Sequence, residues 1–126
     1  MAEKKKTDEP VKTEEVVKPI EIWDKNGNFK YLLEFDRDTV KWAESRGFNT
    51  ESEGIRITDT EELFWYSFRK HHPNVSRAET DRILYEDLHG LSPEVFQRLV
   101  KLFTIPYEAL IQTEEGAKNA TLTIKL

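Results

Sequence analysis

The stretch EELFWYSFRKHH, residues 61–72, sets four bulky apolar side chains side by side in a chain of which 34% of the residues are charged. We expect a helix over residues 60–72, because one of residues 58–60 can cap its start and the His72-Pro73 pair disfavours further turns. A helix with a single buried stripe has no need of such a run. The stretch therefore raises the question of whether every face of this helix is covered within the domain.

A helical wheel divides the side chains of this helix between two faces. Trp65 lies at the edge of the arc that faces the expected core, and Tyr66 lies on the opposite side. The core-facing arc holds Leu63, Phe64, Phe68 and His71. In one interpretation, Trp65 and Tyr66 pack beneath the hairpin or beneath a polar loop at 48–57. In the other they form a partner-binding surface, since aromatic residues are enriched at binding hot spots. The candidate partner-binding residues are then Trp65, Tyr66, Arg69 and Trp42, a residue that projects away from the inward stripe of its own helix.

The preceding segment IEIWDKNGNFKYLLEF, residues 20–35, predicts a β-hairpin. Asn26-Gly27 is a preferred pair for a type I′ turn, in which both central residues have positive φ. A two-residue loop at this pair fixes the register of the two strands. The expected cross-strand pairs are Ile22–Tyr31, Ile20–Leu33 and Trp23–Lys30.

Capping signals predict four short helices along the rest of the chain. Their expected bounds are 38–46, with Asp36 or Asp38 as cap and Gly47 beyond the end; 60–72; a third helix from the Ser76–Glu79 capping box to Gly90; and a fourth from Ser92-Pro93 to Pro106, with a short continuation to Ile111. The predicted fold class is mostly α (α+β), an N-terminal β-hairpin followed by a compact bundle of about four short helices.

The chain divides into three parts by composition. Residues 1–18 predict a disordered charged tail, because they carry balanced charges and no apolar periodicity. Residues 19–112 are expected to form a single hairpin-plus-helical domain. Residues 113–126 end in NATLTIKL, which alternates polar and apolar residues, and predict a flexible or weak-strand segment.

Composition excludes several classes of function. The net charge is −5, with 24 acidic and 19 basic residues, which argues against nucleic-acid binding because that function needs clustered bases. No apolar run approaches the roughly 20 residues of a membrane span. The absence of cysteine fits a reducing compartment. We therefore expect a cytosolic protein that binds neither nucleic acid nor membrane.

Residues that could carry catalysis or bind metal do not form a known pattern. DKNGN, residues 24–28, resembles the start of an EF-hand loop, but Phe29 and Phe35 stand where that loop requires glycine and glutamate. His71 and His72 are neighbours, so on a helix they point about 100° apart and cannot share one ion. No nucleophile elbow, P-loop or dinucleotide fingerprint is found. The prediction is a protein that is not an enzyme and needs neither metal nor cofactor.

The order of these elements resembles a known family. The chain contains a hairpin that ends in LLEFDRDTVKWAESRGF (32–48). After it come an acidic loop, the stretch TEELFWYSFRKHHPNVSRAETDRIL (60–84) and a helix that begins with Ser-Pro. This order is similar to that of the tail assembly chaperones of long-tailed (siphovirus-type) bacteriophages of Gram-positive bacteria. The resemblance covers about residues 20 to 112 and includes no catalytic signature.

The resemblance implies a helper protein in the host bacterial cytoplasm that assists tail tube assembly and is absent from the mature virion. Its implied partner is the tape-measure protein, and its further partners are the major tail protein, a frameshifted longer form of the chain and other copies of itself. The alternative is a small cytosolic regulatory or antitoxin-like adaptor that acts by protein–protein interaction. No binding motif transfers residue by residue from the family, so the candidate site rests on the helical wheel alone.

Overall fold

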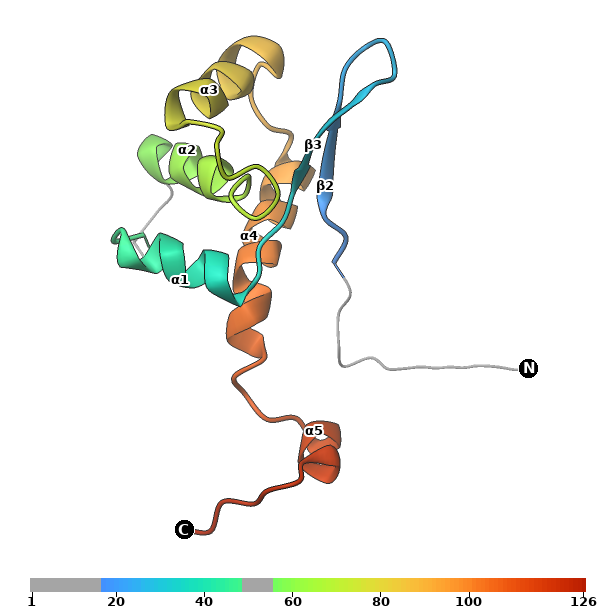
Figure 1. Ribbon diagram of the computed structural model, residues 1–126, viewed down its shortest axis with the longest axis vertical. Coiled ribbons are helices and arrows are strands. Elements are labelled where there is room, and N and C mark those ends of the chain that lie inside the picture. The colour runs from blue at the N-terminus through green and yellow to red at the C-terminus, as the bar shows by residue number, and fades with distance from the viewer. Residues whose placement is uncertain (1–16, 49–55) are drawn as a thin grey trace, which may run out of the picture.

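The computed structural model describes residues 17–48 and 56–126 (Figure 1). The elements, in chain order, are β2 (Ile20–Trp23), β3 (Phe29–Leu33), α1 (Arg37–Ser45), α2 (Ile57–Tyr66), α3 (Arg77–Arg82), the π-helical turn η2 (Ile83–Asp87), α4 (Pro93–Glu108) and α5 (Glu114–Asn119). Helices α1, α2 and α3 are stacked on one side, the hairpin lies on the other, and α4 runs along both. The predicted α+β fold class is confirmed.

Residues just before the predicted domain boundary at residue 19 belong to the described part of the chain. Val17 already packs against the hydrophobic core, so the predicted tail of residues 1–18 reaches two residues too far. The remainder of that tail, residues 1–16, lies outside the described residues. The prediction of disorder for it stays a prediction.

The loop of the hairpin differs from the predicted type I′ turn. Gly27 has a φ of 84°, but Asn26 is not in the left-handed region. Gly27 N–H donates to the Asp24 carbonyl (3.1 Å), and Asp24 N–H donates to the Asn28 carbonyl (2.9 Å). This is the pattern of a three-residue loop in which a turn is followed by a left-handed glycine. The Asp24 carboxylate favours it by accepting the N–H groups of Asn26 and Asn28, both at 2.9 Å.

The longer loop changes the register at one end of the hairpin only. The predicted pairs Ile20–Leu33 and Ile22–Tyr31 are confirmed. A bulge between Ile22 and Trp23 then places Trp23 opposite Phe29, so the predicted pair Trp23–Lys30 is wrong. The two rings meet edge to face with centroids 5.5 Å apart.

Three of the four predicted helices start at their predicted capping residues, whereas α2 starts after Arg56 and not after one of residues 58–60. Asp36 Oδ1 accepts the Thr39 N–H, and Thr39 Oγ1 accepts the Asp36 N–H, both at 2.8 Å, which makes a reciprocal capping box. Ser76 and Ser92 accept the N–H groups three residues ahead and open α3 and α4. Gly47 follows α1 with a φ of 89°, as expected for a residue just beyond a helix end.

Helix lengths differ more from the prediction. Helix α2 starts at Ile57 and ends at Tyr66, whereas residues 60–72 were expected; Arg56 precedes it and binds the Asp59 carboxylate at 2.9 and 3.0 Å. Helix α4 continues through Pro106 without a break, because a proline in the last turn removes little of the hydrogen-bond ladder. Helix α5 was not predicted. The segment after it forms no strand within this chain, so of the two predicted alternatives for residues 113–126, flexible or weak-strand, the strand is not formed here.

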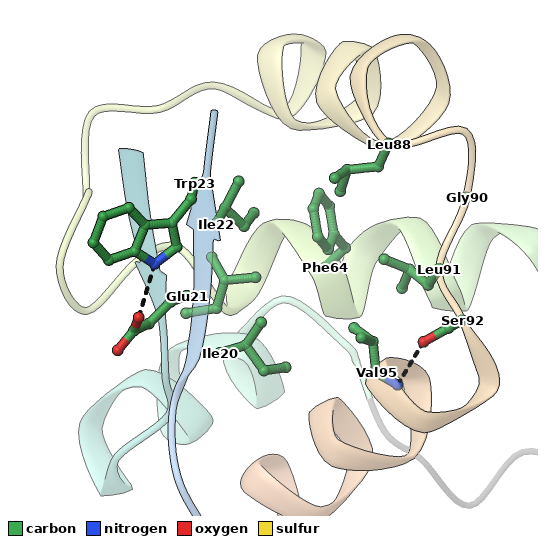
Figure 2. Close-up of a pocket in the computed structure, with 11 residues that line it drawn as sticks. Ile20, Glu21, Ile22, Trp23, Phe64, Leu88, Gly90, Leu91, Ser92 and Val95 are labelled. Atoms are coloured by element: carbon green, nitrogen blue, oxygen red, sulfur yellow. Dashed lines mark hydrogen bonds between the residues drawn. The ribbon is translucent and has the colours of Figure 1, made fainter. Parts of the chain in front are cut away.

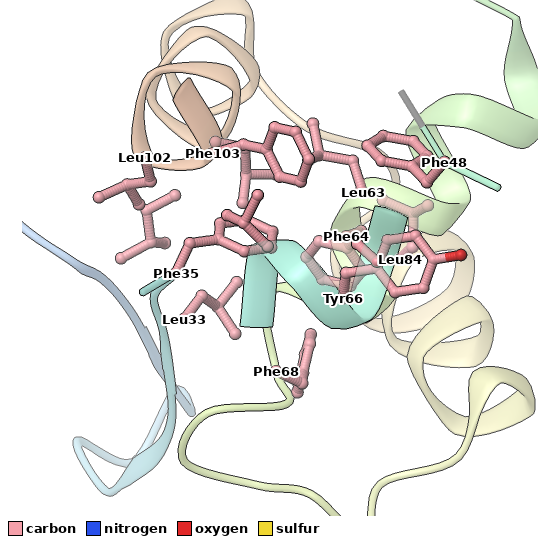
Figure 3. Close-up of a cluster of buried hydrophobic side chains, with 14 of the residues drawn as sticks. Leu33, Phe35, Phe48, Leu63, Phe64, Tyr66, Phe68, Leu84, Leu102 and Phe103 are labelled. Atoms are coloured by element: carbon pink, nitrogen blue, oxygen red, sulfur yellow. The ribbon is translucent and has the colours of Figure 1, made fainter. Parts of the chain in front are cut away.

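The core is built from apolar side chains of β2, β3, α1, α2, η2 and α4 and of the loops between them (Figure 3), whereas α3 contributes only the buried Thr80. Phe35 and Phe48, which flank α1, both pack edge to face on Phe103 of α4, with centroids 5.1 and 5.2 Å apart. Phe48 is 6% exposed, although it was assigned to a polar loop at 48–57; residues 49–55 of that loop lie outside the described residues. The hairpin, α1 and α4 are therefore joined through one aromatic cluster.

Candidate partner-binding surface

The structure brings the four candidate partner-binding residues together. Trp42 comes from α1, Trp65 and Tyr66 end α2, and Arg69 lies in the turn after it. The ring of Trp42 contacts those of Trp65 and Tyr66 with centroids 5.3 and 5.1 Å apart. The Arg69 guanidinium lies over the Trp42 ring at 4.1 Å. Residues that are far apart in the sequence thus form one continuous patch.

Tyr66 does not belong to the exposed part of this patch. Its side chain is 2% exposed, so the prediction that it faces away from the core is wrong. Phe48 covers the ring at 5.2 Å, and Trp42 and Trp65 cover it further. Burial raises the pKa of the Tyr66 hydroxyl, and the nearby charge of Glu62 raises it further. The first interpretation, in which Tyr66 packs beneath a neighbouring segment, is the one the structure bears out for this residue.

The exposed part of the patch consists of Trp42, Trp65, Arg46 and Arg69, which we call the tryptophan–arginine surface. The two tryptophans are half-buried and the two arginines are exposed. The Arg46 guanidinium lies 5.5 Å from the Trp42 ring and 5.1 Å from the Trp65 ring. Stacking of this kind is worth about 0.5–1 kcal/mol at exposed sites. The arrangement places two half-buried indoles beside two positive charges.

Polar contacts fix the position of Trp65. Its indole N–H donates to the Val75 carbonyl at 3.3 Å. Beside it, Arg77 of α3 donates to Glu61 of α2 at 3.0 Å and to Asp81 at 3.2 Å. Tyr85 donates to the other Glu61 oxygen at 2.5 Å. This network joins α2 to α3 and holds the wall of the tryptophan–arginine surface in place.

Arg46 was missed as a site residue, although the sequence contains a signal for it. Each of the two tryptophans is followed four residues later by an arginine, as Trp42–Arg46 and Trp65–Arg69. Residues at i and i+4 are neighbours on a helix surface. The observed stacking of Arg46 over Trp42 follows this spacing, whereas Arg69 stacks on the tryptophan of the other helix because α2 ends at Tyr66.

A second candidate surface is a groove beside strand β2 of the hairpin. An apolar groove of about 250 Å³ is enclosed by β2, the loop after η2 and the start of α4. Figure 2 shows Ile20 and Ile22 pointing into it, toward Phe64, Leu91 and Val95, while Glu21 and Trp23 point away. Leu88 at its rim is 38% exposed and Trp23 is 54% exposed. None of these residues was predicted as a site.

The rim of this groove has an unusual backbone. The Leu88 N–H donates to the Ile83 carbonyl at 2.9 Å, five residues back, which makes the π-helical turn. His89 and Gly90 then both have positive φ, 56° and 97°. A non-glycine residue in this region is uncommon. These features turn the chain sharply into Leu91 and the cap of α4.

Two negative findings concern the described residues only. No three histidine or acidic side chains in residues 17–48 and 56–126 are grouped so that they could hold a metal ion. No helix within the same ranges has the length and apolar character needed to cross a bilayer.

Comparison with known proteins gives one assignment. A search of curated proteins and a search of solved structures found no match. A family model described as "Domain of unknown function (DUF5055)" matches residues 3–126. Since this match covers almost the whole chain, the protein belongs to that family.

Proposed function

We propose that this protein is a phage tail assembly chaperone, which binds the tape-measure protein in the host cytoplasm and assists tail tube assembly without entering the virion. One structural observation supports the proposal: two half-buried tryptophans from different helices lie in contact with each other and beside two exposed arginines. Tryptophan and arginine are the residues most enriched at binding hot spots. The order of sequence elements, which resembles that family, supplies the identity of the partner.

The geometry of the tryptophan–arginine surface fits an amphipathic helix as its ligand. The half-buried indoles of Trp42 and Trp65 provide an apolar contact area, and Arg46 and Arg69 lie beside it with positive charge. A helix with apolar residues on one stripe and acidic residues beside it would bury its stripe against the indoles and pair with both arginines. Covering such stripes is what a chaperone of a long helical protein must do.

The proposal is tested by capture of a co-expressed tape-measure fragment. Arg69→Glu reverses the charge beside Trp42 and removes the stacking without opening the core. We expect capture to weaken at least about tenfold, while the melting temperature stays within a few degrees. Arg98→Glu is the matched control, because this residue is exposed on α4, away from the tryptophans.

The outcomes separate the proposal from its alternatives. Equal capture by the Arg69→Glu and Arg98→Glu variants contradicts the assigned surface. Loss of capture on Leu88→Ala, which truncates a side chain at the rim of the groove, instead assigns the partner to the groove. Failure of the wild-type protein to capture any tape-measure fragment contradicts the chaperone function, and favours a different kind of adaptor.

A further inference from the structure

The two edges of the hairpin differ in how their backbone groups are paired. On the outer edge of β3, the Leu32 N–H donates to His72 Nε2 at 2.9 Å, and the Glu34 N–H just beyond the strand donates to the Ser67 carbonyl at 3.0 Å. The segment after α2 therefore closes this edge. An N–H that points to this edge cannot also bond across the sheet, so Leu32 and its partner Glu21 form a non-hydrogen-bonded pair.

The same reasoning shows that the outer edge of β2 is open. Because Glu21 is in a non-hydrogen-bonded pair, its N–H and C=O point away from β3. Because the direction of the backbone groups alternates along a strand, the N–H and C=O of Trp23 also point away from β3. The next residue agrees with this, since the Asp24 N–H points toward β3 and donates to the Asn28 carbonyl. Among the described residues, the backbones of Glu21 and Trp23 have no partner on this side. An unpaired edge next to an apolar groove is a template for an added strand.

The C-terminal segment has the pattern of a strand without a sheet. Thr121, Thr123 and Lys125 alternate with apolar residues. The apolar side chains point into solvent, with Leu122 86%, Ile124 91% and Leu126 122% exposed. Period-two alternation with β-branched residues is typical of a half-buried strand. Three apolar side chains exposed at alternate positions form an apolar strip, and an exposed strip of this kind is typical of a surface that binds a partner.

We propose that residues 121–126 of a second copy of this chain add as a strand to the outer edge of β2. In an antiparallel register that pairs Lys125 with Glu21, Ile124 lies beside Ile22, and Leu126 lies beside Ile20. The apolar side chains then enter the groove, and the opposite charges of Lys125 and Glu21 share the other face. One register thus satisfies the backbone edge, the groove and the charges.

A second copy fits better as the source of this strand than the chain's own tail. The groove lies at the start of α4, where Ser92 and Val95 line it. Helix α4 has 16 residues, which span about 24 Å at 1.5 Å per residue. Figure 1 shows α5 and the C-terminus continuing beyond its far end, away from the hairpin. Two copies can exchange these segments reciprocally and form a closed dimer.

Sedimentation of the full-length protein tests the proposal. We expect a dimer, and we expect Ile124→Lys to weaken dimerisation at least about tenfold, because it places a charge in an apolar groove. Thr123→Lys is the matched control: its side chain lies on the face away from the groove, so dimerisation should change by less than about threefold. A monomeric wild type, or equal effects of the two variants, would overturn the proposal.

Cross-linking identifies the contact directly, since the chain contains no cysteine. Protein with Glu21→Cys is mixed with protein with Lys125→Cys and treated with a short bismaleimide. The expected product is a covalent dimer between the two variants, and replacement of Lys125→Cys by Lys118→Cys in α5 should lower its yield at least about tenfold. Absence of this product, or a cross-link within single chains of a monomeric double variant, contradicts the exchange. Capture of the tape-measure fragment is measured separately, so either proposal can fail without the other.

Discussion

Substitution of Tyr66 by alanine should destabilise the domain as strongly as the loss of any core aromatic. The ring is 2% exposed and contacts Trp42, Phe48 and Trp65, with centroids between 5.1 and 5.2 Å. Removing a buried aromatic side chain costs about 3–5 kcal/mol, because transfer free energy is lost and a cavity remains. We therefore expect a loss of about 4 kcal/mol in the free energy of unfolding.

Urea denaturation followed by tryptophan fluorescence measures this loss, since Trp42 and Trp65 adjoin the cavity. Tyr66→Phe keeps the ring and removes only the hydroxyl, so it should cost no more than about 1.5 kcal/mol. Tyr85→Ala removes a tyrosine that is 50% exposed but donates to Glu61, so it should cost less than Tyr66→Ala, about 2 kcal/mol or less. A loss below about 1 kcal/mol for Tyr66→Ala would refute the assignment of this residue to the core.

Three further predictions concern local features of the fold. Gly27→Val should lower the free energy of unfolding by about 1–3 kcal/mol in urea titrations, since nothing crowds the position and the whole cost comes from the φ of 84°; Gly27→Asn should cost less. Asp36→Ala should cost about 0.5–2 kcal/mol by the same measurement, because it removes the cap of α1. His72 accepts the Leu32 N–H through Nε2, and burial lowers its pKa; the unfolded chain therefore binds a proton first, and stability should fall as pH decreases below about 6.5. His72→Gln should reduce the change in melting temperature between pH 7 and pH 5, and His89→Asn should leave that change as it is in the wild type.

Features set by neighbouring residues could be read from the sequence. A cap depends on one side chain and the backbone three residues ahead, so Asp36, Ser76 and Ser92 were identified correctly. The loop of the hairpin failed for an equally local reason. Asn26-Gly27 favours a type I′ turn, but the Asp24 carboxylate binds two N–H groups of the loop and selects a longer one. The residue that selects the longer loop, Asp24, directly precedes the turn in the sequence.

The position of Tyr66 could not be read from a helical wheel, because a wheel assumes that one face of a helix is buried. Helix α2 is covered on more than one side. Trp42 of α1 and Phe48 beyond it pack on the face that the wheel assigned to solvent. These contacts join segments about 20 residues apart, and no local pattern specifies them. Apolar side chains on every face of a helix indicate burial on all sides. The run Leu63–Tyr66 places apolar side chains on every face of one helical turn, and it therefore indicates burial of the whole turn.

The two proposed surfaces lie at different parts of the fold, and the segment between α2 and α3 contributes to only one of them. Arg69 forms part of the tryptophan–arginine surface, and three residues later His72 closes the outer edge of β3. The groove lies at the opposite edge of the hairpin, against β2. Because the two surfaces share no residue, a second copy bound at β2 leaves the tryptophans accessible, and a dimer would present two such surfaces. Substitutions at separate sites usually have additive effects. Arg69→Glu should therefore leave dimerisation unchanged and Ile124→Lys should leave single-site capture unchanged, while the dimer gains avidity for a ligand that repeats its apolar stripe.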